Sequence, residues 1–72
     1  MTIIDARGLS CPEPVLLARR AIQALGPGGD LEVLVETVTS RENVLRAARS
    51  LGCTVQADAT PEGGFRLRIH KP

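Results

Sequence analysis

The sequence has little of what several functional classes require. Its 72 residues include one phenylalanine, no tryptophan or tyrosine, one histidine and two cysteines. Two cysteines are too few for a small secreted disulfide scaffold, and one histidine without a second ligand beside it indicates no metal site. The formal net charge is only +1, with acids and bases interspersed. Nothing in this composition indicates a nucleic-acid partner, because no basic field stands out.

The chain also lacks long hydrophobic runs. The longest, Val15–Ala18, is far too short to span a bilayer. The opening segment MTIIDARG has neither the basic nor the apolar region of a signal peptide. We therefore expect a cytoplasmic protein with no membrane association and with both thiols free. The length allows a single domain, residues 1–72, which buries roughly 60% of its unfolded surface on folding.

Apolar periodicity predicts two helices that alternate with strands and precede a hairpin. The first helix is predicted from Pro12 to Leu25. The second follows an N-cap at Thr39, with Glu42 completing a capping box, and stops at Gly52. Strands are predicted over residues 2–5, 30–36, 53–59 and 65–70, and the turn PEGG connects the last two.

Alternation in three of the four strands determines the expected architecture. Apolar residues face one side of each of these strands, for example Cys53, Val55, Ala57 and Ala59 in the third. This pattern predicts a sheet with one face covered by helices and the other exposed to solvent, because strands covered on both faces would be continuously apolar. The predicted fold is an α/β two-layer sandwich, βαβαββ, with a mixed four-stranded sheet and two helices on one face.

Cys11 lies at the predicted start of the first helix, in the segment SCPEP. There it would be the N-cap, with Pro12 at the first helical position, which favours proline. Pro14 has no N–H, so of the two usual cap donors only the Glu13 amide could bond the sulfur. The helix N-terminus favours a thiolate, whereas the Glu13 carboxylate opposes it. Arg7 would offset Glu13 only if the intervening loop brings it close. These residues alone leave both a structural and a reactive cysteine open.

The motif around Cys11 resembles a known signature. The pattern D-x-x-G-L-x-C-P-x-P is similar to that of the TusA family, also called SirA-like, of small sulfur carriers. The matching residues are Asp5, Gly8, Leu9, Cys11, Pro12 and Pro14. The later segments RENVLRAARSLGCTV and GGFRLRIHK look more like the YedF-like branch. One departure is ETVTS, which stands where TusA itself usually has an Asp-Pro pair.

The resemblance implies a sulfur carrier or sulfurtransferase-type persulfide carrier with Cys11 as its reactive residue. Cys11 would take sulfane sulfur from a donor such as a cysteine desulfurase or a rhodanese and pass it to a thiol of an acceptor relay protein. Such thiolate exchange needs no cofactor and no metal. The residues expected to position the thiol are Asp5, Gly8, Leu9, Pro12, Glu13 and Pro14.

Alternatives are a non-catalytic binding or regulatory module of the same fold, a selenium-related role, or a redox-sensing thiol. The donor, the acceptor and the end product of the relay are left open by the sequence, and we expect a monomer. Leu16 falls on the polar stripe of the first helix with Arg19 and Arg20, and these three are a candidate patch for partner docking.

The remaining candidates favour structural interpretations. Cys53 falls in the inward register of its strand, which indicates core packing. Basic residues place positive charge on the open sheet face, but acids share that face and the chain's only aromatic residue, Phe65, points inward. We therefore predict cross-strand ion pairing and no RNA platform. The basic residues are Arg66, Arg68, His70 and Lys71, and the acids are Glu32, Glu36 and Asp58.

Overall fold

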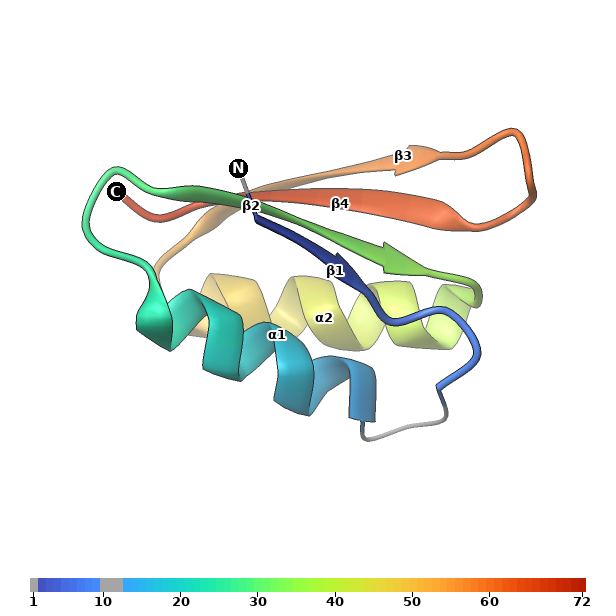
Figure 1. Cartoon of the computed structure of the whole chain (residues 1–72), viewed down its shortest axis with the longest axis horizontal. Coiled ribbons are helices and arrows are strands. Elements are labelled where there is room, and N and C mark those ends of the chain that lie inside the picture. Colours follow the sequence, from blue (N-terminus) through green and yellow to red (C-terminus); the bar gives the residue numbers. More distant parts are fainter. Residues whose placement is uncertain (1, 10–12) are drawn as a thin grey trace.

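A computed structural model of the chain describes residues 2–9 and 13–72. Figure 1 shows two layers, a twisted sheet and the helices packed on one of its faces. The elements are β1 (Thr2–Asp5), α1 (Glu13–Ala24), β2 (Asp30–Val35), α2 (Val38–Ser50), β3 (Thr54–Ala59) and β4 (Phe65–His70). The strand order is β1-β2-β4-β3. β1 runs parallel to β2, and β4 runs antiparallel to both of its neighbours. The predicted mixed sheet and element order are confirmed.

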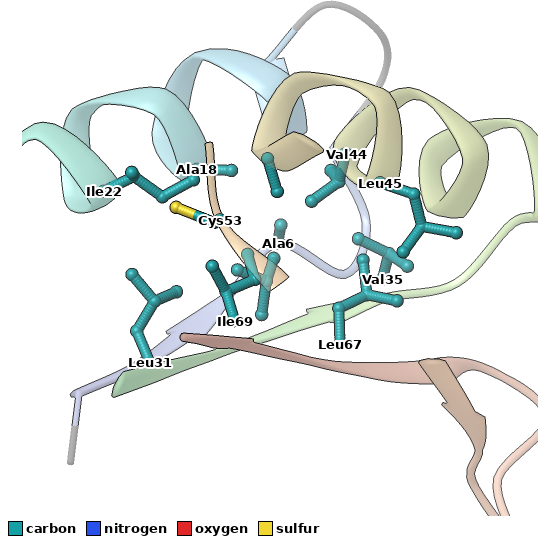
Figure 2. Packing of buried hydrophobic residues seen from close by; sticks show 12 residues of the cluster. Ala6, Ala18, Ile22, Leu31, Val35, Val44, Leu45, Cys53, Leu67 and Ile69 are labelled. Carbon is teal, nitrogen blue, oxygen red and sulfur yellow. The ribbon is translucent and has the colours of Figure 1, made fainter. Parts of the chain in front are cut away.

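The core lies between the inner face of the sheet and the two helices (Figure 2). Leu31, Val33 and Val35 of β2 are at most 1% exposed, as are Leu67 and Ile69 of β4. Burying such side chains stabilises the fold by about 1.5–3 kcal/mol each. The predicted alternation is therefore confirmed in the two central strands. On the helix side the buried residues include Ala18, Ile22, Val44 and Ala48.

The predicted inward row of β3 is wrong in its second half. Cys53 is buried and Val55 is half-buried, but Ala57 and Ala59 are exposed. β3 is an edge strand with a neighbour on one side only. Small side chains there remain accessible even where the alternation points them toward the helix layer, because fewer atoms surround them.

The start of α2 differs from the prediction by two residues. Thr37, not Thr39, is the N-cap, with extended backbone angles of φ −113° and ψ 155°. Its Oγ1 accepts a hydrogen bond of 3.0 Å from the Ser40 amide. β2 ends at Val35, so the short connection makes the helix begin at Val38, and Thr39 lies inside the first turn. The capping box with Glu42 is therefore not formed, because both threonines carry the same local signal and the connection selects the earlier one.

The ends of the helices agree better with the sequence. Gly52 has φ +80° just after α2, where its predicted stop requires a left-handed residue. α1 begins at Glu13 and ends at Ala24, within a residue of the predicted limits. The predicted N-cap at Cys11 and first position at Pro12 lie outside the described residues. Within residues 2–9 and 13–72, no helix has the length and apolar character needed to cross a membrane.

Candidate functional site

The segment that leads toward Cys11 begins with a tight turn. Ala6 is 2% exposed, and its amide donates to the Leu34 carbonyl at 2.9 Å, which continues the ladder of β1 with β2. The Leu9 amide then approaches the Ala6 carbonyl at 3.4 Å. Gly8, the third residue of this turn, has φ +80°. A positive φ at this position is the feature of a type II turn, which favours glycine because a Cβ is strained there. The motif glycine therefore fixes the direction in which the chain leaves β1.

Asp5 and Arg7 hold the same turn from outside. Arg7 donates from Nε to Asp5 Oδ1 and from Nη2 to Oδ2, both at 2.9 Å, and its backbone amide donates to Oδ1 at 3.1 Å. The side-chain hydrogen bonds of Arg7, followed by its backbone hydrogen bond, lower the pKa of Asp5 to about 2. The charge of Arg7 is therefore paired with Asp5. Any influence of Arg7 on Glu13 or on the thiol is reduced accordingly.

Anchored residues lie on both sides of residues 10–12. Leu9 is half-buried and packs against the core, and Pro14 is fully buried in the first turn of α1. Glu13 is exposed beside it. A proline in the first turn is tolerated because the amide it lacks has no intrahelical acceptor there. Leu9 and Pro14 are thus packed into the protein, and their roles in positioning the thiol stay predictions, while Pro12 and the cysteine lie outside the described part of the chain.

A groove of about 260 Å³ at the same end of the sheet was missed by the sequence reasoning. It is lined by Arg7, Glu36, Thr60, Glu62, Gly63 and Gly64. Asp5 raises the pKa of Arg7 most, and the nearby carboxylates of Glu62 and Glu36 raise it further. The sequence signal was available, because β1, β2 and the β3–β4 turn must meet at one end of this topology. The side-chain partners were not readable from spacing.

Comparison with known proteins identifies the family. A family model described as sulfurtransferase TusA matches residues 2–71. The chain belongs to the TusA family. The sulfur carrier protein TusA of Pseudomonas aeruginosa is 38% identical over 69 residues, which are 96% of this chain and 87% of that protein. A Methanocaldococcus jannaschii protein, provisionally named a sulfur carrier, is 37% identical over 71 residues, covering 99% of this chain and 95% of that protein.

The fold comparison agrees with the family. The crystal structure of a SirA-like protein from Desulfitobacterium hafniense superposes with a TM-score of 0.92 at 35% sequence identity. The match covers 97% of this chain and 96% of that chain. The resemblance drawn from the motif is therefore confirmed at the level of family and fold.

The candidate docking residues of this TusA-family chain are exposed on α1. Leu16 is 46% exposed, and Arg19 and Arg20 are exposed one turn further along. The three residues share one face of the helix, because positions three and four apart are neighbours. The predicted exposure is confirmed, and the docking role stays a prediction.

Cys53 is a core residue. It is a free cysteine with 6% exposure, and Figure 2 shows its sulfur between the helix layer and the sheet, near Ile22. A buried thiol of this kind behaves as a small apolar side chain. The predicted packing role is confirmed, and Cys53 is not placed to exchange sulfur with a partner protein.

The open face of the sheet carries the predicted ion pairs. Glu32 of β2 lies 3.7 Å from Arg66 and 3.9 Å from Arg68 of β4, and His70 Nδ1 lies 2.6 Å from Asp30 Oδ1. A second groove, of about 420 Å³, is lined partly by Asp30, Arg68 and His70. It lies where β2 begins and β4 ends, opposite to the end that carries the motif. Among the described residues, no three His, Cys, Asp or Glu side chains gather as a metal site would require.

Lys71 does not contribute to that face as predicted. Its Nζ donates to the carbonyls of Ile22 at 3.2 Å and Leu25 at 3.0 Å. The last carbonyls of a helix have no intrahelical donors and carry partial negative charge. The lysine therefore turns away from the open face and caps the C-terminus of α1, a contact over 46 and 49 residues that no local pattern predicts.

Proposed function

We propose that this chain carries sulfane sulfur between proteins as a persulfide on Cys11. The observation that carries the proposal is the family match over residues 2–71 together with the intact D-x-x-G-L-x-C-P-x-P motif. Cys53, the other cysteine, is buried in the core. The exchange must take place at the protein surface, and we therefore assign it to Cys11.

The chemistry is two thiolate exchanges. In the first, the Cys11 thiolate attacks the outer sulfur of a donor persulfide. A new S–S bond forms, the donor's S–S bond breaks, and the donor cysteine leaves as a thiolate. In the second, a thiolate of the acceptor attacks the outer sulfur on Cys11 and releases the Cys11 thiolate. The sulfane sulfur is neither oxidised nor reduced overall, so neither step requires an external oxidant or reductant.

The residues before and after Cys11 favour presentation of its sulfur to a partner over a strong lowering of the thiol pKa. Cys11 precedes the first residue of α1 by two positions in the sequence, and the positive end of a helix favours a thiolate on a cysteine that begins it. The exposed Glu13 opposes this effect, and the guanidinium of Arg7 is engaged by Asp5. Meanwhile the buried Ala6 and Pro14 fix the chain on either side. A relay protein benefits from such a moderate thiol, because a thiol of very low pKa is also a weaker nucleophile.

We further propose that donor and acceptor dock on the face of α1 formed by Leu16, Arg19 and Arg20. This face begins one turn beyond Glu13 and only five residues after Cys11 in the sequence, so it belongs to the part of the chain that directly follows the motif. An exposed leucine flanked by two arginines suits a surface with an apolar pocket and acidic rim. The proposed donors are a cysteine desulfurase or a rhodanese, and the proposed acceptor is a relay protein with a reactive thiol. A reducing compartment such as the cytoplasm suits this chemistry.

Loading is tested by intact-mass spectrometry after incubation with a cysteine desulfurase and free cysteine. The expected product is the chain plus one sulfur atom, lost on treatment with a reducing thiol. Cys53→Ser is the matched control and gains the same sulfur, whereas Cys11→Ser gains none. No adduct on the wild-type chain with several donors would favour a binding module. Oxygen addition or a Cys11-linked dimer under peroxide, without sulfur loading, would identify a redox sensor.

A further inference from the structure

The eight arginines of the chain form two groups that differ in their partners. One group forms ion pairs with carboxylates at 2.8 to 3.9 Å. Its members are Arg7, Arg41, Arg66 and Arg68. The other group is exposed and makes no ion pair with any residue in the described ranges, 2–9 and 13–72. Its members are Arg19, Arg20, Arg46 and Arg49, and all of them belong to the two helices.

The unpaired arginines lie on the side of the helix layer that is turned away from the sheet. Ala18 of α1 and Val44 of α2 are fully buried and point toward the sheet in Figure 2. Arg20 and Arg46 each follow two residues later, which turns them by about 200° to the opposite side of the helix. Arg49, three positions after Arg46, lies on the same face of α2.

The two helices present these arginines in one layer. α1 and α2 pack against each other, and Figure 1 shows both helices beginning at the same end of the molecule. In the described parts of α1 and α2, the acids are Glu13 at the start of α1 and Glu42, which is paired with Arg41. The second half of each helix therefore carries arginine and no acid. We call Arg19, Arg20, Arg46 and Arg49 together the arginine surface.

Folding alone does not explain why these arginines lack partners. Arg46 and Arg49 are three positions apart on α2, and like charges at this spacing repel each other. On the sheet, by contrast, Glu32 lies within 4 Å of two arginines. A partner that brings carboxylates to the arginine surface would remove the repulsion, so the charge on this surface favours association with such a partner.

An acidic protein surface suits the arginine surface better than a nucleic acid does. The planar guanidinium of arginine can bind a carboxylate through two parallel hydrogen bonds. Leu16, 46% exposed, lies one turn before Arg19 and Arg20, and an apolar side chain next to arginines is typical of protein interfaces. Surfaces that bind single-stranded RNA stack bases on aromatic rings. The chain's only aromatic residue, Phe65, packs against the core.

We propose that Arg46 and Arg49 extend the docking face of Leu16, Arg19 and Arg20 onto α2, and that this surface binds an acidic surface of the sulfur donor protein. The inference rests on the proposed function, because the donor is the partner whose chemistry it specifies. The arginines raise the rate at which the donor and the chain associate, because complementary surface charges steer the encounter. They have no part in the sulfur exchange itself.

The test measures the association rate constant with an immobilised cysteine desulfurase by biolayer interferometry at several salt concentrations. The double variant Arg46→Gln, Arg49→Gln associates at least about threefold more slowly than wild type at low ionic strength, and the difference shrinks as salt screens the charges. Arg66→Gln, Arg68→Gln is the matched control. It removes the same charge from the sheet face and associates at close to the wild-type rate. Equal association rates for the two double variants overturn the proposal.

Sulfur loading of the same proteins separates the proposal from the proposed function. With saturating desulfurase the α2 variant loads at the wild-type rate, because charge steering affects only the encounter. A wild-type chain that binds the desulfurase but accepts no sulfur overturns the proposed function alone. Normal loading with an association rate that does not depend on salt overturns the arginine surface alone. So does an α2 variant that loses affinity for a duplex RNA but keeps the wild-type association rate with the desulfurase.

Discussion

Arg7 binds the carboxylate of Asp5, two residues earlier in the chain, through Nε and Nη2 at 2.9 Å each. The Arg7 amide binds the same carboxylate, so the pair closes the turn that leads from β1 toward Cys11. Both side chains are about half exposed, and exposed ion pairs contribute little to stability. Their main effect is therefore on the shape of this turn.

The Asp5–Arg7 pair predicts a pH dependence. The pKa of Asp5 is lowered from 3.8 to about 2, so its stabilising effect is complete above the unfolded value and is lost as the pH falls through the folded one. We expect Asp5→Asn to be less stable than wild type at neutral pH, and the difference to shrink as the pH falls from about 4 to about 2. Urea denaturation at a series of pH values measures it. In an Arg7→Gln background the pH-dependent difference disappears, and a difference that is constant with pH would contradict the account.

Glycine substitutions distinguish a constraint on backbone conformation from a constraint on the space for a side chain. A Cβ on Gly64 would lie 2.5 Å from the Val35 carbonyl oxygen, whereas Gly8 has open space but φ +80°. We expect Gly8→Ala to cost about 1 kcal/mol through backbone strain and Gly64→Ala about 1–3 kcal/mol through overpacking. A Cβ on Gly26 would meet no atom within 4 Å, so Gly26→Ala is the control and changes stability by less than about 1 kcal/mol. Equal costs for Gly64→Ala and Gly26→Ala, measured by chemical denaturation, would show the close approach to be wrong.

The N-cap of α2 gives a prediction with a built-in control. Thr37→Ala removes the acceptor of the Ser40 amide and should cost about 1 kcal/mol. Thr39→Ala, two residues later on the exposed surface of the first turn, should cost less than about 0.5 kcal/mol. Thermal or urea unfolding of both variants measures the difference. A larger loss of stability for Thr39→Ala than for Thr37→Ala would indicate that Thr39 is the N-cap, as the sequence alone suggested.

The docking face predicts a loss of transfer without a loss of fold. Leu16→Asp places a charge in the exposed apolar centre of the patch and should slow sulfur acceptance from a cysteine desulfurase at least about fivefold, since central apolar contacts carry much of an interface. Gln23→Asp adds the same charge two turns further along the exposed side of α1 and should accept sulfur at the wild-type rate. Single-turnover loading followed by mass spectrometry compares them. Sulfur loading of Leu16→Asp at the wild-type rate would contradict the docking role of this face of α1.

The sequence predicted the parts of the fold that depend on local periodicity. Leu31, Val33 and Val35 alternate because one face of β2 meets the helices, and this pattern was sufficient to predict a two-layer sandwich. Ala57 and Ala59 alternate in the same way but are exposed, since alternation does not say whether a strand is central or at the edge. Strand order is a non-local property, and it determined which of these predictions were correct.

In the site, too, features that depend on local sequence were predictable and long-range contacts were not. Gly8 was predictable as a turn residue from its type, and Asp5 from the motif. The contact of Lys71 with the end of α1 and the side-chain partners in the groove beside Arg7 depend on segments far apart in the sequence, so no spacing reveals them.

The central claim is that sulfur leaves Cys11 for a second protein as well as arriving there. The direct measurement loads the chain with radioactive sulfur from a cysteine desulfurase, removes the donor, and adds a sulfur-relay protein with a reduced cysteine as the acceptor thiol. We predict that the label moves to the acceptor while the chain loses the mass of one sulfur atom, with Cys53→Ser behaving as wild type. Label that stays on the chain, or that never enters it at Cys11, would contradict the account.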